Sequence, residues 1–213
     1  MKGRFLNFEG IDGSGKTTQI GLLCEHLKKV GIPFVTTREP GGTPIAEDLR
    51  DVLLRLRSDE VMHPMTELLV YFAARVQHYH TYIRPKLNEG FHVICDRFTP
   101  STYAYQAAGR QIDLSVVKAL DSLAMDSVKP DLTVYIDIDI EESSKRVNSR
   151  APVKLDRMDL QKDSFRSLVR NGYLEQVILD PQRFAVVSGR DSIESVHRSV
   201  LESVMPLLKI TKE

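Results

Sequence analysis

Residues 9–19 of the chain read EGIDGSGKTTQ, and the part from Gly10 to Thr17 fits the pattern G-x-x-x-x-G-K-[ST]. An apolar segment typical of a strand precedes it, and the amphipathic pattern of a helix follows it. Glycines let backbone N–H groups face phosphates, and the helix directs its positive N-terminus at the same anion. The expected phosphate-binding loop consists of Gly10, Ile11, Asp12, Gly13, Ser14, Gly15, Lys16, Thr17 and Thr18.

The sequence of the loop indicates which cofactors the protein binds. Lys16 should reach the β- and γ-phosphates of a nucleotide, and the Thr17 hydroxyl should bind Mg²⁺. ATP (or GTP) and magnesium are therefore expected. A purely structural glycine-rich turn is the alternative, but the strand before the loop and the helix after it favour phosphate binding.

Asp12 lies inside this loop, where its charge would repel phosphate. Two like charges about 4 Å apart repel by roughly 4 kcal/mol at an effective dielectric near 20. We therefore expect the Asp12 side chain to point away from the donor phosphates, toward another group.

Bulk composition excludes several classes of protein. The 213 residues carry 29 Lys+Arg and 29 Asp+Glu, so no overall basic field would attract nucleic acid or anionic lipid. No run approaches the roughly 20 apolar residues of a membrane span, and no signal-peptide segment is present. Cys24 and Cys95 form no C-x-x-C pair and are expected to be buried, reduced thiols. A soluble cytoplasmic protein without nucleic-acid or membrane partners is predicted.

Apolar segments rich in β-formers alternate with helical patterns along the chain. This alternation predicts an α/β fold with a parallel sheet, in a single domain spanning residues 1–213. The polar, arginine-bearing stretch at residues 150–159, RAPVKLDRMD, breaks the pattern and is interpreted as a lid. Strands are expected at residues 4–9, 34–37, 91–95, 132–138 and 184–188, and helices at 17–30, 45–57, 64–87, 115–125, 141–149, 160–179 and 192–205.

The third expected strand, residues 91–95, is followed directly by Asp96 and Arg97. A carboxylate at a strand end beside the phosphate loop can hold a metal, usually through water, and an adjacent arginine would serve a second phosphate. Two anionic substrates meeting over one Mg²⁺ is the arrangement of a kinase. The N-K-x-D motif of a guanine-reading switch protein is absent from the sequence.

Further arginines fit a second anionic substrate. Arg75 lies four residues after Tyr71, so the two share one helix face and could hold a base and its phosphate together. Arg50 lies in the helical pattern that follows PGGTP. Considered singly, each arginine could be an exposed cation, and Tyr71 could pack in the core.

From Phe8 onwards the chain resembles the bacterial thymidylate kinases. The matching blocks are EGIDGSGKTT, TREPGGTPIAEDLR, YFAARVQH, DRFTPSTYAYQ, KPDLTVYIDI and SRAPVKLDRMD. The resemblance implies a P-loop NTPase fold with a five-stranded parallel sheet flanked by helices and a short lid. It also implies transfer of the γ-phosphate of ATP to dTMP, giving dTDP in dTTP biosynthesis, by a homodimer built through helices.

The same resemblance implies an acceptor site. Asp12 matches a residue that turns toward the deoxyribose and binds its 3′-hydroxyl. Thr102 and Gln106 resemble the residues that read thymine edges. The aromatic residue that stacks on thymine is Tyr71, or Phe72 if the register shifts by one. Glu39 would lie near the acceptor and magnesium, Ser101 in a neighbouring pocket position, Asp96 at the metal, and Arg50, Arg75 and Arg97 at the acceptor monophosphate.

One branch of the family that the chain resembles places a catalytic arginine in the phosphate loop, and the other places it in the lid. This phosphate loop holds no arginine, so the resemblance implies a catalytic arginine in the lid. Arg150, which opens the lid, is the first candidate and Arg157 the second; either would act together with Lys16 and Arg97. Arg146 resembles the residue that covers adenine, with a solvated cation at a helix end as the alternative.

Two other functions stay open. A deoxynucleoside kinase would accept uncharged thymidine and usually shows E-R-S where this chain has Asp96-Arg97-Phe98. A nucleotide-binding regulatory protein that has lost catalysis would not need Lys16, Thr17, Asp96 and lid arginines together.

Overall fold

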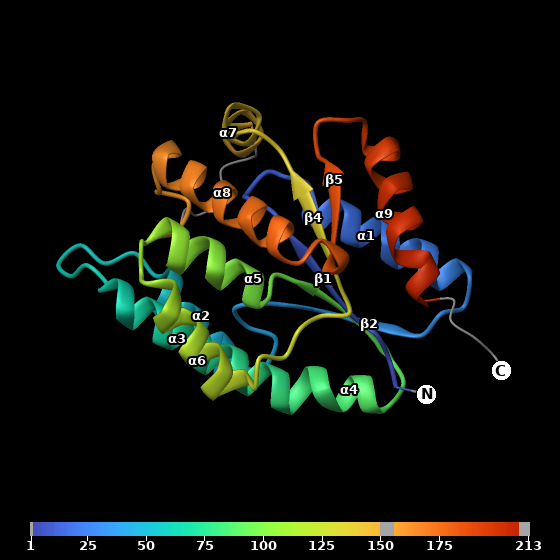
Figure 1. The fold of residues 1–213 in the computed structure, drawn as a ribbon, viewed down its shortest axis with the longest axis horizontal. Coiled ribbons are helices and arrows are strands. Elements are labelled where there is room, and N and C mark those ends of the chain that lie inside the picture. The colour runs from blue at the N-terminus through green and yellow to red at the C-terminus, as the bar shows by residue number, and fades with distance from the viewer. Residues whose placement is uncertain (1, 150–155, 209–213) are drawn as a thin grey trace.

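The computed structural model describes residues 2–149 and 156–208. Five parallel strands form one sheet in the order β2-β3-β1-β4-β5 (Figure 1). The strands are β1 (Phe5–Glu9), β2 (Phe34–Arg38), β3 (His92–Asp96), β4 (Leu132–Asp137) and β5 (Phe184–Ser188). The expected parallel α/β sheet is thereby confirmed.

The pairing register of the sheet places the carboxyl ends of β1 and β3, which carry the predicted site residues, beside each other. Phe8 of β1 pairs with Asp96 of β3 and with Val134 of β4. The carboxyl ends of β1 and β3 therefore meet at one edge, which is where open α/β sheets bind ligands.

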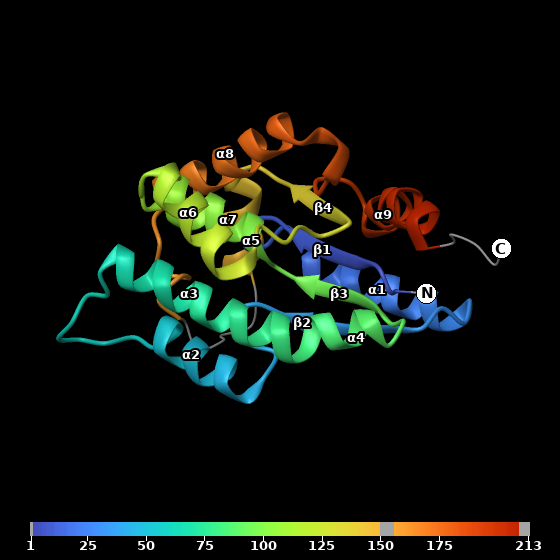
Figure 2. The same cartoon turned by 60° about the horizontal axis from the view of Figure 1, so that its bottom comes forward.

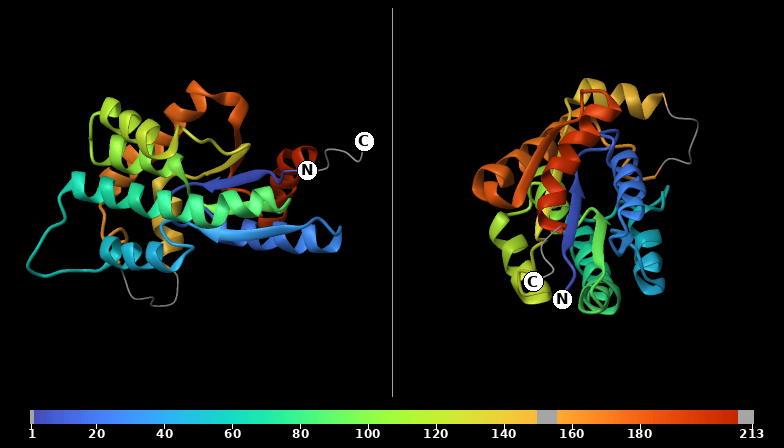
Figure 3. Two further views of the ribbon diagram at one scale, coloured as in Figure 1. Left: turned by 90° about the horizontal axis from the view of Figure 1, so that it is seen from below. Right: turned by 90° about the vertical axis from the view of Figure 1, so that its right-hand side faces the viewer.

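Helices cover both faces of the sheet (Figures 2 and 3). On one face α1 (Lys16–Lys29) and α9 (Ile193–Leu208) pack against Leu6 and Phe8. On the other, α3 (Pro64–His78) and α6 (Leu114–Met125) pack against Phe5. Alternate β1 side chains serve opposite cores because successive strand residues point to opposite faces. The other helical segments are α2 (Pro44–Leu54), α4 (Arg84–Asn88), α5 (Thr99–Thr102), α7 (Ile140–Asn148), α8 (Asp163–Leu179), two π-helical stretches (Tyr79–Ile83 and Tyr103–Gly109) and a 3₁₀ turn (Pro181–Arg183).

Two segments differ from the sequence-based expectation. The predicted helix at residues 64–87 is present but runs as α3, a π-helical turn and α4. The sequence predicts that Pro85 ends or kinks this helix; it does not end it, and it lies in the first turn of α4, directly after the π-helical stretch. Residues 99–109, for which no helix was expected, are helical. Their small and polar residues gave no apolar period to detect.

None of the helices in residues 2–149 and 156–208 is long and apolar enough to cross a membrane. Most of the expected lid, residues 150–155 with Arg150, lies outside the described residues.

Candidate functional site

The loop between β1 and α1 curls around the Lys16 side chain. Lys16 is buried and its Nζ donates to the Gly10 carbonyl at 2.9 Å. Gly10 has a φ of 147°, and a Cβ there would lie 2.6 Å from the Ile136 carbonyl oxygen. Glycine is therefore required at this position. Burial, and then the charge of Arg97, lower the pKa of Lys16.

A cavity of about 220 Å³ opens over this loop, and Lys16, Thr17 and Asp96 line it. Asp96 Oδ1 is buried and has no hydrogen-bond partner among the described residues. A buried carboxylate oxygen beside a threonine hydroxyl is a donor set suited to Mg²⁺, which takes few protein oxygens and keeps waters and phosphates as its other ligands. The residues present thus fit the expected metal.

A second cavity, of about 130 Å³, adjoins the first and shares with it Asp12, Glu39, Arg50 and Arg97. It brings together residues from the loops after β1 and β2, from α2 and α3, from the segment after β3 and from residues 156–159. Of the residues expected at the acceptor site, it is lined by Asp12, Glu39, Arg50, Tyr71, Arg75, Arg97, Ser101, Thr102 and Gln106.

Tyr71 and Phe72 have different environments. Tyr71 lines the second cavity, and burial, followed by the charge of Glu67, raises its pKa to about 12. Phe72 packs in the core with Leu68 and is absent from the cavity lining. Neighbouring residues on a helix are about 100° apart, so only one of the two can face the cavity.

Asp12 and Arg97 form an ion pair, with 2.8 Å between Oδ1 and Nη2. Burial opposes the charged form of Asp12, but Arg97 and Lys16 outweigh it and hold the pKa of this carboxyl below its usual value. Arg97 has a φ of 70° and also donates to the Tyr173 hydroxyl at 3.1 Å. The Asp12 carboxylate is therefore directed to the arginine beside the second cavity.

Arg75 is compensated by Glu39. Its Nε lies 2.7 Å from Glu39 Oε2, and its Nη1 donates to Thr102 Oγ1 at 2.7 Å. His78 Nδ1 lies 3.0 Å from the other Glu39 oxygen, and all of these side chains are buried. Arg75 is thereby fixed beside Thr102.

Glu9 and Tyr105 are site residues that the sequence analysis missed. The Glu9 carboxylate accepts hydrogen bonds from Phe98 N, Ser101 Oγ and the Tyr173 hydroxyl, and so fixes the turn that carries Arg97. The Tyr105 ring lies 5.0 Å from the Arg97 guanidinium carbon and lines the second cavity. Glu9 ends an otherwise apolar strand. The polar residues Asn7 and Glu9 alternate along it and so share one face of the strand, and this pattern could have marked Glu9 as a site residue.

A third cavity, of about 380 Å³, also borders the phosphate loop. Arg146 lines it together with Gly13, Ser14 and Gly15. The Arg146 Nε donates to Glu142 at 2.6 Å, which holds the guanidinium beside the loop.

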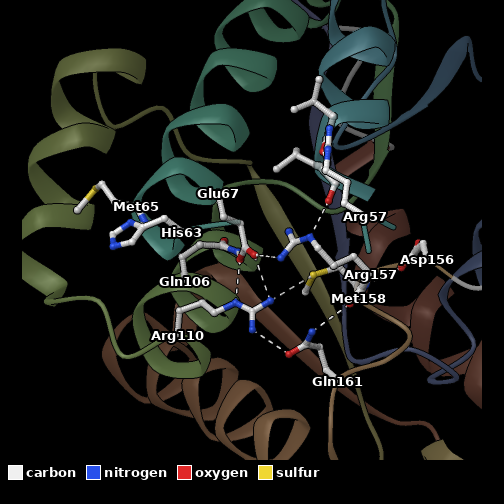
Figure 4. Close-up of polar contacts among 12 residues, drawn as sticks. Arg57, His63, Met65, Glu67, Gln106, Arg110, Asp156, Arg157, Met158 and Gln161 are labelled. Carbon is white, nitrogen blue, oxygen red and sulfur yellow. Dashed lines mark hydrogen bonds and ion pairs between the residues drawn. The ribbon is translucent and has the colours of Figure 1, made fainter. Parts of the chain in front are cut away.

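Of the two lid arginines, the structure describes the contacts of Arg157 alone. Arg150 lies outside the described residues. Arg157 is held on α3 and α2, with Nη1 2.5 Å from Glu67 Oε2 and Nε 2.8 Å from the Leu53 carbonyl oxygen (Figure 4). In this conformation Arg157 does not line the phosphate-loop cavity.

Comparison with known proteins gives one consistent result. The family whose model matches residues 8–200 is described as Thymidylate kinase. The chain is 44% identical over 207 residues to the thymidylate kinase of Pelobacter propionicus, covering 95% of this chain and 94% of the relative. It is 43% identical over 212 residues to that of Caldanaerobacter subterraneus, covering the whole of both. The crystal structure of the Ehrlichia chaffeensis thymidylate kinase superposes with a TM-score of 0.76 at 36% identity, covering 96% of this chain and 99% of that chain.

Proposed function

The chain belongs to the thymidylate kinase family, and on that premise we propose how its residues carry out the reaction. The protein transfers the γ-phosphate of ATP to dTMP, giving dTDP for dTTP biosynthesis, with Mg²⁺ as cofactor. The observation that carries the residue assignment is the pair of adjoining cavities that share Asp12 and Arg97.

The base of dTMP binds at the Tyr71 end of the second cavity. Tyr71 stacks on thymine, while Phe72 supports it from the core. Thr102 and Gln106 contact the edge of the base. The resemblance implied Arg75 at the acceptor monophosphate; we propose instead that it acts at this end, because Glu39 already compensates its charge and Thr102 accepts its hydrogen bond.

The sugar and the acceptor phosphate bind at the Asp12 end. Arg97 and Arg50 line both cavities and neutralise the phosphate where it faces the donor. The carboxylate of Asp12 accepts a hydrogen bond from the 3′-hydroxyl, and Ser101 lies in the adjoining wall. This arrangement explains an acidic residue inside a phosphate loop.

Phosphoryl transfer has a loose transition state, so the protein acts mainly by positioning groups and compensating charge. Lys16 binds the donor β- and γ-phosphates, and Arg97 aligns the acceptor phosphate. Thr17 and Asp96 would hold Mg²⁺, which would supply positive charge beside the phosphates. The acceptor phosphate is already largely ionised at pH 7, with a second pKa of about 6, and so needs no general base. Arg150 supplies the catalytic lid charge, and Arg146 covers adenine.

We further propose a cytoplasmic homodimer of single-domain subunits, each with residues 150–159 as its lid. The apolar side chains of Leu69 on α3 and Leu123 on α6 are exposed, by 49% and 85%, on neighbouring helices, which supports pairing through helices. Free Cys24 and Cys95 are compatible with a reducing compartment. Light scattering at the subunit mass of 24.1 kDa or at twice that mass decides the oligomeric state.

A coupled ADP-release assay tests the activity. We expect rapid, Mg²⁺-dependent turnover with dTMP and ATP, and little with thymidine. Preference for thymidine would indicate a deoxynucleoside kinase, and tight ATP binding without turnover would indicate a regulatory protein.

A further inference from the structure

Glu67 lies on α3, fully buried, at the centre of a polar cluster that joins three parts of the chain. Its Oε1 accepts from Gln106 Nε2 at 2.7 Å and from Arg110 Nε at 3.1 Å. Its Oε2 accepts from Arg110 Nη2 at 3.1 Å and from Arg157 Nη1 at 2.5 Å. Figure 4 shows these side chains converging on the one carboxylate. No other acidic side chain in the described residues receives two arginines and an amide.

The Glu67 carboxylate is ionised. Burial favours its neutral form, but Arg110, followed by Arg157 and Gln106, outweighs burial and holds the pKa of Glu67 below its usual value. An ionised carboxylate accepts hydrogen bonds and donates none. The group that Gln106 turns toward Glu67 is therefore its NH₂ and not its carbonyl.

This requirement fixes what Gln106 presents to the second cavity. The two ends of a glutamine amide have nearly the same shape, and only the hydrogen-bond partners decide which end points where. Gln106 lines the cavity, and its Oε1 makes no hydrogen bond with the described residues. With the NH₂ held by Glu67, the carbonyl oxygen is the end left for a ligand.

A carbonyl oxygen at this place accepts a hydrogen bond from a base that carries a ring N–H. The N3 of thymine carries a hydrogen, whereas the N3 of cytosine is itself an acceptor. We propose that Glu67 is a specificity-determining positioning residue. It fixes the orientation of the Gln106 amide, so that the acceptor site selects pyrimidines with an N3–H. This inference rests on the function proposed above.

The substitution Glu67→Gln tests whether Glu67 fixes the orientation of the Gln106 amide, and it changes the shape of the side chain at position 67 very little. Arg110 and Arg157 both contact the Oε2 position, so the remaining carbonyl oxygen of E67Q stays with them. Its NH₂ then faces Arg110 Nε, which loses its acceptor, and Gln106, whose amide must turn and present NH₂ to the cavity. We expect the ratio of kcat/KM for dTMP to that for dCMP to fall by about tenfold or more, because a site built for one hydrogen-bonding pattern rejects the other.

A merely structural role for Glu67 predicts a different result. Loosening of Arg110 and Arg157 would lower kcat for dTMP and dCMP alike and leave their ratio unchanged. Asp121→Asn is the matched control, since Asp121 is a buried carboxylate that accepts from the Tyr103 hydroxyl at 2.9 Å and does not line the second cavity. D121N should keep the wild-type ratio.

Gln106→Met supplies an independent measurement should E67Q fail to fold. It removes both ends of the amide, so the ratio should fall through loss of activity on dTMP, with dCMP nearly unaffected. In the double variant E67Q/Q106M the ratio should equal that of Q106M alone. An unchanged ratio in folded E67Q, or in Q106M, overturns the proposal, while turnover of dTMP by the wild type would still support the kinase function itself.

Discussion

The Asp12 carboxylate and the Arg97 guanidinium lie 2.8 Å apart and line both the cavity over the phosphate loop and the adjoining one. The side chains of Arg97 and Asp12 are 18% and 36% exposed, and the Arg97 charge, against the effect of burial, helps to hold the pKa of Asp12 below its usual value. A ligand hydroxyl beside Asp12 and a ligand phosphate beside Arg97 would thus be held by one preorganised unit.

Asp12→Ala should therefore damage the acceptor site and spare the donor site. Loss of a hydrogen bond to a charged group costs about 1.5–3 kcal/mol, which corresponds to a roughly 10- to 150-fold lower kcat/KM for dTMP. The KM for ATP should change little. Steady-state kinetics with each substrate varied in turn measures both. A D12A variant whose defect lies in ATP binding would contradict this assignment.

Substitutions of Tyr71 should affect dTMP binding, whereas substitutions of Phe72 should affect the stability of the core. Tyr71→Ala should raise the KM for dTMP with little effect on folding, whereas Tyr71→Phe keeps the ring and should retain most activity. Phe72→Ala should cost about 3–5 kcal/mol of unfolding free energy, because it empties a packed site. Urea titration together with dTMP kinetics distinguishes them. The assignment is reversed if F72A is stable and Y71A unfolds.

Substitutions of the two lid arginines should also have different effects, on kcat for Arg150 and on stability for Arg157. An arginine supplied to the transferring phosphoryl group contributes roughly 10³–10⁵ in rate, so Arg150→Ala should lower kcat by at least about a thousandfold. Arg157 pairs with Glu67 and Leu53. Arg157→Ala should chiefly lower stability, by about 1–3 kcal/mol, and reduce kcat much less. Near-wild-type kcat in R150A would remove the lid from the mechanism.

Glu67 should make stability depend on pH in the acid range. Its pKa is lowered from an ordinary value of 4.5 in the folded protein, so its contribution is fully present above about pH 4.5 and is lost as pH falls through the lower folded value. Glu67→Gln should therefore be less stable than the wild type at neutral pH, and its unfolding free energy should fall less steeply below about pH 4.5. Urea unfolding across this range gives both slopes. Equal slopes would mean that Glu67 does not titrate as the structure implies.

The sequence predicted contiguous features well. The phosphate loop, the strand that precedes it and the helix that follows it are encoded within about 25 neighbouring residues, where spacing and periodicity are informative. The segment at residues 99–109 was missed because its helical turns, including a π-helical stretch, carry no apolar period.

Side chains that act across long stretches of sequence were less predictable. Glu67 meets its partners 39, 43 and 90 residues away, and Glu9 meets Tyr173 164 residues away. No local pattern marks such pairs. Tyr71 and Phe72 could not be separated from the sequence either, because the rotation of α3 about its axis depends on the packing of Leu68 and Phe72 in the core.

The most direct test of the account is a crystal structure of the protein with dTMP and a non-hydrolysable ATP analogue. We predict the 3′-hydroxyl within hydrogen-bond distance of Asp12, the thymine ring against Tyr71, and the acceptor phosphate between Arg97 and the donor γ-phosphate. A dTMP sugar bound away from Asp12, with the base outside the cavity lined by Tyr71 and Gln106, would contradict the account.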